Sequence, residues 1–239
     1  MKKLLALLCT LGIAQPAMAA SITNLGAIGG QAPFRTLSED LGAALSYKPI
    51  TPAAPLGTTG FDMGIAVTQT DMSKSSQLWS KITNNGSTVS KLYVPKLHIA
   101  KGLPLDIDIA AFYSKIPSTN ITLYGGELRY AILPGSLTQP AIAIRGAFTK
   151  LSGVEQLALN TRSLDVSISK GFAMFTPYAG IGQVWVNSTA NVAGLAAEKF
   201  TQFKTFVGAN LNLGFGNFAA EMDKTGGIQS VSVKLGSRF

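Results

Sequence analysis

The chain ends in Val231-Ser-Val-Lys-Leu-Gly-Ser-Arg-Phe239, a stretch in which apolar and polar side chains alternate. Successive side chains of a β-strand point to opposite faces of the sheet, so this stretch predicts a strand with two different faces. One face is apolar and ends on an aromatic side chain: Val231, Val233, Leu235 and Phe239. The other face is polar: Ser232, Lys234 and Arg238. Such a strand is suited to separate hydrocarbon from water.

The first 19 residues have the three parts of a secretory signal peptide. Met1-Lys-Lys is cationic, Leu4–Ile13 is apolar, and Ala17-Met-Ala19 forms a cleavage site. A membrane anchor is the less favoured alternative, because the apolar run is too short to span a bilayer. We expect residues 1–19 to be removed together with Cys9, the only cysteine, which leaves no thiol for a disulfide or a metal site.

Composition limits the class of protein. The 239 residues leave about 220 after cleavage, a usual size for a single all-β barrel domain. Hydrophobic residues make up 46% of the chain, yet no apolar run after residue 20 reaches the length of about 18 residues that a spanning helix needs. The formal net charge is +8, and the basic residues are scattered among acidic ones, so we expect no nucleic-acid partner. The positive surplus is compatible with an anionic lipopolysaccharide surface.

From residue 59 to residue 239, segments of alternating side chains are separated by turn-forming residues, which is typical of a transmembrane barrel. We expect about ten strands, with room for 10–12, near residues 59–70, 89–101, 103–116, 120–133, 139–151, 159–171, 172–188, 200–214, 216–224 and 227–239. Their connections alternate between long loops and tight turns, which lie on the external and periplasmic sides of such barrels. The sequence therefore predicts an all-β fold, an antiparallel up-and-down transmembrane β-barrel with both of its ends in the periplasm.

Ionised side chains avoid the apolar faces of the predicted strands. A Lys or Arg that faces lipid at mid-depth would cost about 2–4 kcal/mol, whereas opposite charges inside a narrow lumen can pair. We expect a charge network in the lumen formed by Asp62, Asp106, Asp108, Glu127, Arg129, Arg145, Asp165, Lys204, Lys234 and Arg238. The polar faces also carry Lys96, Glu221 and Asp223. A barrel of about ten strands is much smaller than a water-filled porin, so we expect these side chains to occupy most of its lumen.

A soluble, secreted β-barrel or sandwich is the alternative for this alternation, since its polar face would be the solvated outside. Four features favour the membrane-spanning barrel. They are the strand lengths of about ten residues, the alternation of loop lengths, the absence of cysteine after cleavage and the terminal aromatic Phe239.

Residues 20–58 precede the predicted barrel and carry the pattern of one short helix. Thr36 and Glu39 have the spacing of a capping box. A leucine recurs at every fourth position, at Leu37, Leu41 and Leu45. Prolines at positions 49, 52 and 55 prevent the helix from continuing. Two placements stay open: a periplasmic helix packed on the mouth of the barrel, or a plug inserted into the lumen.

The sequence has few candidates for chemistry. His98 is the only histidine, and it lies three residues before the predicted turn at Lys101-Gly102, so we expect it to face the lumen near the periplasmic end. Asp106 and Asp108 could form an acid pair, but their basic neighbours favour ion pairs. The chain has no G-x-S-x-G motif, no two-histidine metal set and no P-loop. We therefore expect no enzyme activity, no cofactor and no metal site.

Several stretches carry a family resemblance: the helix before the barrel, Gly57-Thr-Thr-Gly-Phe-Asp62, Tyr124-Gly-Gly-Glu127 and Lys234-Leu-Gly-Ser-Arg-Phe239. Through them the chain resembles Gram-negative outer-membrane β-barrel proteins, in particular an uncharacterised family of predicted outer-membrane barrels with an N-terminal helical segment. The resemblance implies a location in the cell outer membrane and a role for Phe239 in the signal read by the barrel-insertion machinery. Ser237 departs from the pattern, since a larger apolar residue is usual there. The N-terminal segment also resembles that of the larger fatty-acid transporter barrels, in which it plugs the lumen.

The sequence thus predicts a monomeric, integral outer-membrane β-barrel that works as a structural barrel or as a narrow passive channel for small solutes. Its expected partners are membrane lipid, lipopolysaccharide and, during assembly, the barrel-insertion machinery. The alternative is an outer-membrane barrel enzyme or a surface-binding protein that acts through the loops at 71–88 and 188–199. An adhesive surface should carry clustered aromatic side chains, and in these loops Trp79 stands nearly alone.

Overall fold

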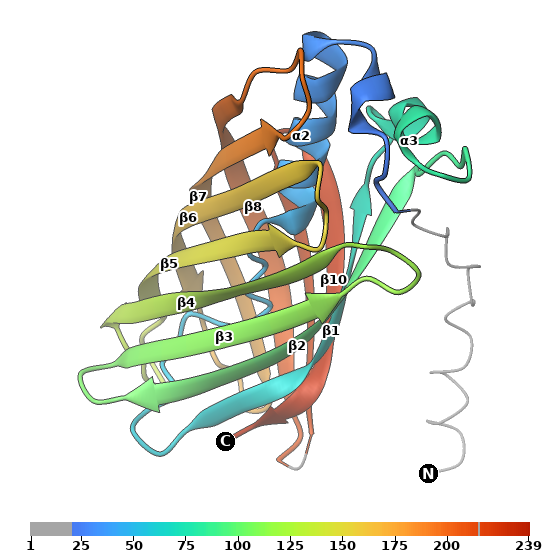
Figure 1. The fold of residues 1–239 in the computed structure, drawn as a ribbon. Helices are drawn as coiled ribbons and strands as arrows, with labels where there is room; N and C mark the ends of the chain where they lie inside the picture. Colours follow the sequence, from blue (N-terminus) through green and yellow to red (C-terminus); the bar gives the residue numbers. More distant parts are fainter. Residues whose placement is uncertain (1–20, 215) are drawn as a thin grey trace, which may run out of the picture.

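A computed structural model of the protein describes residues 21–214 and 216–239. The predicted signal peptide, residues 1–19, lies outside this range. Ten strands form one closed antiparallel barrel, in which each strand pairs with its neighbours in the chain and the first strand pairs with the last (Figure 1). This arrangement confirms the predicted all-β up-and-down barrel and its number of strands.

The helices precede or interrupt a continuous series of strands. The strands are β1 (Phe61–Asp71), β2 (Lys91–Leu103), β3 (Ile107–Lys115), β4 (Thr122–Leu133), β5 (Ala141–Ser152), β6 (Leu157–Ser169), β7 (Phe175–Ala190), β8 (Glu198–Asn212), β9 (Asn217–Thr225) and β10 (Ile228–Arg238). The helices are the 3-10 helix η1 (Leu25–Ile28), α2 (Gln31–Leu45) and α3 (Ser76–Ile82). No helix within the described residues is long and apolar enough to cross a membrane.

The barrel is polar inside and apolar outside. In β10, Ser232 and Lys234 are buried in the lumen, whereas Val233 and Leu235 on the outer face are 54% and 53% exposed. Every strand contributes exposed apolar side chains to this outer face, among them Ile65, Leu97, Ile109, Leu128, Ile144, Val166, Ile181, Phe203, Met222 and Val233. A soluble β-barrel would place its polar face outside, so the observed arrangement argues against that alternative.

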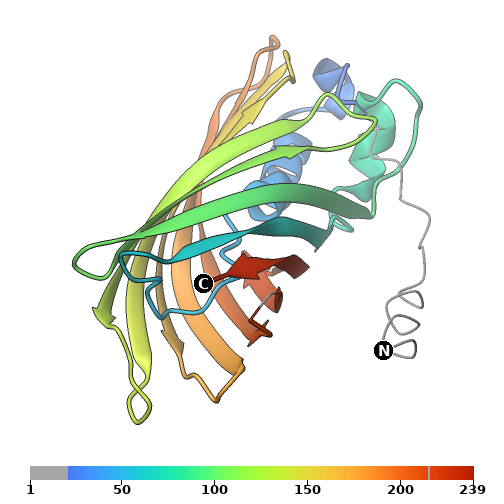
Figure 2. The same cartoon turned by 90° about the horizontal axis from the view of Figure 1, so that it is seen from below.

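The two ends of the barrel sequence meet at one rim. The backbone N–H of Phe61 donates to the carbonyl oxygen of Phe239 at 2.7 Å, and the N–H of Phe239 donates to the carbonyl oxygen of Phe61 at 3.0 Å. The two rings lie 5.9 Å apart between centroids. Figure 2 shows the C-terminus beside the start of β1. The terminal aromatic therefore takes part in closing the barrel.

The connections follow the predicted alternation only in part. The β1–β2 connection, residues 72–90, is long and contains α3. At the same end of the barrel, the β9–β10 connection consists of Gly226 and Gly227 alone, so this end does not carry long loops only. Both glycines have positive φ angles, 59° and 88°, which other residues rarely adopt, so the chain can reverse within two residues.

Helix α2 begins five residues before the predicted capping box, which is therefore wrong. Gly29 and Gly30, with φ angles of 98° and 108°, turn the chain into the helix, and no side chain caps its first turn. The hydroxyl of Thr36 instead donates to the carbonyl oxygen of Ala32, and Glu39 accepts a hydrogen bond from Arg35. The helix ends before the prolines, as predicted.

Helix α2 lies inside the barrel, at the end opposite the C-terminus (Figure 1). It contacts β1, β2, β6, β7, β8 and β10, and its apolar side chains Phe34, Leu37, Leu41 and Leu45 are fully buried or nearly so. Residues 46–57, called here the lumen segment, then run through the barrel to the other end, where β1 begins. Of the two placements open from the sequence, the structure has the plug.

The loop aromatic Trp79 is not a surface residue. It lies on α3 and is 0% exposed, packed in a core cluster with apolar side chains of η1 and α2. Helix α3 and η1 contact each other above the same end of the barrel. This aromatic therefore stabilises the cap over the lumen and is unavailable to a binding partner.

Removing Phe239 should reduce the amount of folded barrel. The deletion eliminates both backbone hydrogen bonds to Phe61 and the contact between the two rings. Folded barrel can be quantified in membranes as the fraction whose gel mobility changes on heating. Phe239→Tyr keeps the backbone bonds and an aromatic ring, so it should assemble like the wild type. Normal assembly of the deletion variant would show that Phe239 contributes nothing to closure.

Candidate functional site

The lumen wall carries the densest set of charges in the described chain. Its buried charged side chains, together with His98, are Asp62, Lys96, Asp108, Glu127, Arg129, Arg145, Asp165, Lys204, Glu221, Asp223 and Lys234, and Arg238 lies at its rim. Each comes from a strand whose alternate residues point inward, so the period of two places them all on one side of the sheet. Nine of the ten residues that the sequence predicts for a lumen network are therefore in or at the rim of the lumen.

Asp106 is the exception, and its predicted place is wrong. Strand β2 continues to Leu103 and β3 begins only at Ile107, so Asp106 lies in the turn between them. Leu105 and Asp106 have φ angles of 65° and 57°, which shift the turn by several residues from its predicted position. Asp106 is partly exposed and forms no ion pair with any described residue.

Asp62 is the centre of a charge cluster near the C-terminal rim. Its carboxylate accepts hydrogen bonds from Lys234 at 2.7 and 2.8 Å and from Arg238 at 3.2 Å. The Nδ1 atom of His98 lies 3.9 Å from the same carboxylate. His98 is buried, as expected for a lumen-wall residue, and no other described histidine accompanies it.

A second cluster joins the wall to the lumen segment. The guanidinium of Arg129 donates two hydrogen bonds to Asp108, at 3.0 and 2.6 Å, and a third to the carbonyl oxygen of Pro52. The other oxygen of Asp108 accepts from the backbone N–H of Leu56 at 3.0 Å. An ion pair on the wall therefore also fixes two points of the chain inside the barrel.

Other cations of the lumen wall also donate hydrogen bonds to backbone carbonyl oxygens of the lumen segment. Lys204 donates to the carbonyl oxygen of Tyr47 at 3.0 Å, and Lys96 donates to that of Lys48 at 2.6 Å. Nearer the C-terminal rim, Arg238 donates to the carbonyl oxygen of Ala54 at 3.0 Å. An extended backbone leaves its carbonyl groups free for such donors, because it makes no helical hydrogen bonds.

Wall acceptors bind the N–H groups of the same segment. Glu221 accepts from the backbone N–H of Ile50 at 3.0 Å, and also from the hydroxyl of Tyr178 at 3.0 Å. The hydroxyl oxygen of Ser169 accepts from the N–H groups of residues 53 and 54. The side chain of Lys48 forms a buried ion pair with Asp223 at 2.7 Å.

Lys48 is a charged residue of the lumen that the sequence pattern does not predict. It lies between the end of α2 and Pro49, and it is a single charge in a segment that is otherwise apolar or neutral up to Pro55. A lone charge in such a segment was the available signal, because a buried ammonium needs an acidic partner. Asp223, on the polar face of a predicted strand, is that partner.

Arg145 is fully buried in the lumen. It is 0% exposed, and its Nε atom lies 2.9 Å from Glu127 Oε2. A separate ion pair joins Lys204 and Asp165 at 3.3 Å. The two terminal nitrogens of Arg145 make no hydrogen bond with the described residues. Arg145 is therefore held mainly by the charge of Glu127.

At the α2 end, polar contacts tie the helix to the rim. Arg35 pairs with Glu39 at 2.7 Å and with Glu198 of β8 at 3.0 Å. The carboxylate of Asp40 accepts from the backbone N–H and the hydroxyl of Ser75, at 2.9 and 2.7 Å. Burial raises the pKa of the Asp40 carboxyl, while the hydrogen bonds from Ser75 act in the opposite direction.

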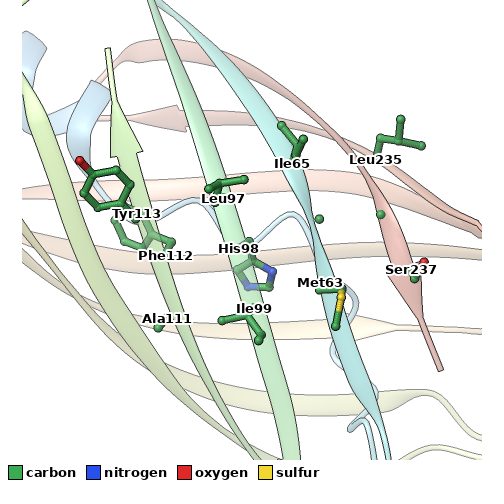
Figure 3. A pocket seen from close by; sticks show the side chains of 12 residues that line it. Met63, Ile65, Leu97, His98, Ile99, Ala111, Phe112, Tyr113, Leu235 and Ser237 are labelled. Carbon is green, nitrogen blue, oxygen red and sulfur yellow. The ribbon is translucent and has the colours of Figure 1, made fainter. Parts of the chain in front are cut away.

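The outer face is chemically different from the lumen. A hollow of about 690 Å³ lies across β10, β1, β2 and β3, lined mainly by apolar side chains such as Met63, Ile65, Leu97 and Leu235 (Figure 3). Gly64 and Gly236 face each other in the β1–β10 pair beneath it. The hollow is also lined by His98 and Ser237, but most of its lining is apolar, so it is suited to hydrocarbon contact.

No described group of three or more His, Cys, Asp or Glu residues could hold a metal ion. The chain matches no protein-family model and no curated protein. Among solved structures it is similar to neisserial surface protein A, with 10% identity, a TM-score of 0.32 and coverage of 75% of this chain and 95% of that one. It is also similar to Ail, the attachment invasion locus protein of Yersinia pestis, with 9% identity, a TM-score of 0.26 and coverage of 75% and 97%. These scores are low, so the barrel assignment rests on the strand pairing of the chain itself.

Replacing Arg145 by alanine should destabilise the barrel. The change leaves the Glu127 carboxylate buried without its counter-charge, which commonly costs about 3–5 kcal/mol. The thermal midpoint of the refolded protein should fall, and Arg145→Ala combined with Glu127→Gln should recover part of the loss. Lys224→Ala, which removes an exposed and unpaired cation on β9, is the matched control. An unchanged midpoint in Arg145→Ala would show that the pair does not stabilise the lumen.

Proposed function

We propose that this protein is an integral outer-membrane β-barrel that acts as a structural barrel or a narrow passive channel for small solutes, closed at rest by its own N-terminal segment. The observation that carries this proposal is the outer face: exposed apolar side chains surround a closed barrel whose charges point inward. In water such a continuous apolar surface would be unfavourable. In a bilayer the same surface contacts the hydrocarbon tails of the lipids. A β-barrel can span a membrane because closure satisfies all of its strand hydrogen bonds.

Orientation follows from the rule for such barrels. The paired ends at Phe61 and Phe239 would face the periplasm, and α2 with the long β1–β2 connection would lie at the external end. The signal-peptide pattern of residues 1–19 supports export across the inner membrane. In this orientation the mature chain passes from the external end through the lumen before it forms the barrel.

The closed state is supported by the contacts of the lumen segment. Backbone atoms of Tyr47, Lys48, Ile50, Pro52, Ala54 and Leu56 bind side chains of β2, β3, β4, β8, β9 and β10. Hydrogen bonds to charged groups contribute about 1.5–3 kcal/mol each. Solute passage through the barrel would therefore require this segment or α2 to move.

The alternatives have less support in the described residues. A surface-binding protein would act through its external loops, but the aromatic Trp79 is buried beneath them. A barrel enzyme would need reactive groups open to a substrate, whereas His98 lies on the lumen wall with 4% of its surface exposed. The mature barrel is proposed to act as a monomer, because strand closure leaves no sheet edge for a second copy.

The mature protein should be recovered in the outer-membrane fraction and should migrate faster in detergent gels before boiling than after. Both results follow from a barrel whose lumen charges and strand ladder resist detergent. A soluble periplasmic protein and a known outer-membrane porin serve as fractionation controls. Recovery of the mature chain as a soluble periplasmic protein would contradict the membrane assignment.

Locking α2 to the wall should suppress conductance. A Cβ atom at Gly42 would lie 2.8 Å from a methyl carbon of Val186 on β7, so cysteines at both positions are within reach of a disulfide. The mature chain has no other cysteine. In planar bilayers, oxidised Gly42→Cys/Val186→Cys protein should show fewer opening events than the same protein after reduction. The single variant Val186→Cys should respond to neither treatment, and equal conductance in both redox states of the double variant would contradict gating by α2.

A further inference from the structure

The outer face of β5 to β8 carries a group of polar side chains next to the apolar band. The register places Lys150 opposite Asn160, Asn160 opposite Asn187, and Asn187 opposite Lys199. One row nearer the C-terminal rim, Arg162 stands between Phe148 and Trp185. All of these positions point outward, because the burial of each strand alternates with a period of two.

These cations have no counter-charge among the described residues. Neither Lys150, Arg162 nor Lys199 forms an ion pair or a side-chain hydrogen bond with residues 21–214 or 216–239, and all three are exposed. A hollow of about 430 Å³ lies between Arg162 and Lys199 and is also lined by Asn160, Trp185, Asn187 and Thr201. The hollow therefore combines two cations, two amides and a hydroxyl with the aromatic side chains of Trp185 and Phe200.

The position of the group relative to the apolar band indicates its surroundings. On the side of the group that faces the C-terminal rim, the apolar side chains of Leu164 and Phe203 are 49% and 58% exposed. Directly inside it lies α2, since Gly42 approaches Val186 of the same β7 stretch. The group thus lies where the apolar face of the barrel ends at the α2 rim, and Trp185 is of the residue type enriched at the boundary between hydrocarbon and headgroups.

The two rims differ in outward charge. At the α2 rim, the described strand residues that point outward include the cations Lys91, Lys115, Lys150, Arg162, Lys199 and Lys224 and the single anion Asp71. At the C-terminal rim the outward-pointing cation is Lys101, whose ammonium donates hydrogen bonds to the carbonyl oxygens of Thr58 and Gly60. An excess of unpaired cations at one rim favours a leaflet that is rich in anionic headgroups.

We propose that Arg162 and Lys199, with Lys150 beside them, bind the phosphate groups of a phosphorylated glycolipid, the lipid A part of lipopolysaccharide, in the leaflet around the α2 rim. A guanidinium binds phosphate oxygens through two parallel hydrogen bonds, and an ammonium adds a point charge. Asn160 and Asn187 supply amide donors for phosphate or sugar oxygens. The acyl chains of the same lipid then contact Leu164 and Phe203. This inference rests on the proposed location in the outer membrane.

The test uses the refolded full-length mature barrel in detergent. It is incubated with lipid A that carries its phosphates, or with the same lipid after dephosphorylation, and the retained lipid is measured by native mass spectrometry. The wild type should retain phosphorylated lipid A in preference to the dephosphorylated form. In Arg162→Gln/Lys199→Gln protein this preference should fall roughly fivefold or more, because two exposed charge pairs are lost. It should also weaken as the salt concentration rises.

The control is Lys91→Gln/Lys224→Gln, which removes the same net charge from the same rim but away from the hollow. It should keep the wild-type preference, and an equal loss in the control would overturn the site. Equal retention of both lipids by the wild type would overturn it as well. So would displacement of lipid A by inorganic phosphate at the same phosphate concentration, since that would make a free anion the occupant. Gel mobility before boiling verifies that each variant is folded, so a folded outer-membrane barrel without lipid preference contradicts only the lipid site.

Discussion

Ten closed strands enclose a narrow interior, and every charge that points into it must find a partner there. A lone buried charge costs several kcal/mol. The charged side chains that one strand points inward therefore need partners on other strands or on the chain inside the barrel. Some pair with each other, as Lys234 does with Asp62 at 2.7 Å. Others, such as Lys96, reach the backbone of the lumen segment instead. The polar lumen and the N-terminal segment therefore depend on each other.

This dependence explains why the segment is extended and rich in proline. Prolines at 49, 52 and 55 keep the chain from forming a helix, so the carbonyl groups stay free for wall cations and the remaining N–H groups stay free for wall acceptors. A helix through the same space would satisfy its own backbone and leave Arg129 and Lys204 short of acceptors. The occluded barrel that we propose follows from these hydrogen bonds between wall and segment, and α2 closes the end opposite the C-terminus through apolar packing.

The strands could be predicted because their signal is local: side chains alternate between two very different surroundings along every strand. The position of Asp106 could not, because it depends on positive φ angles at both Leu105 and Asp106, and a leucine rarely adopts such an angle. The start of α2 was missed because glycines, rather than the Thr36 and Glu39 pattern, turn the chain into the helix. The contact of Lys48 with Asp223 joins residues far apart in sequence, and pairing at that distance leaves no pattern in a single chain.

The central claim is that the wall charges hold residues 46–57 in the lumen. Hydrogen exchange at the backbone amides of Ile50 and Leu56 in the refolded barrel tests it most directly, since each N–H donates to a buried wall carboxylate at 3.0 Å. The account predicts protection comparable to that of amides in the middle of β6. Exchange as fast as that of the β7–β8 loop, residues 191–197, would show that the segment is not held and that the lumen is open.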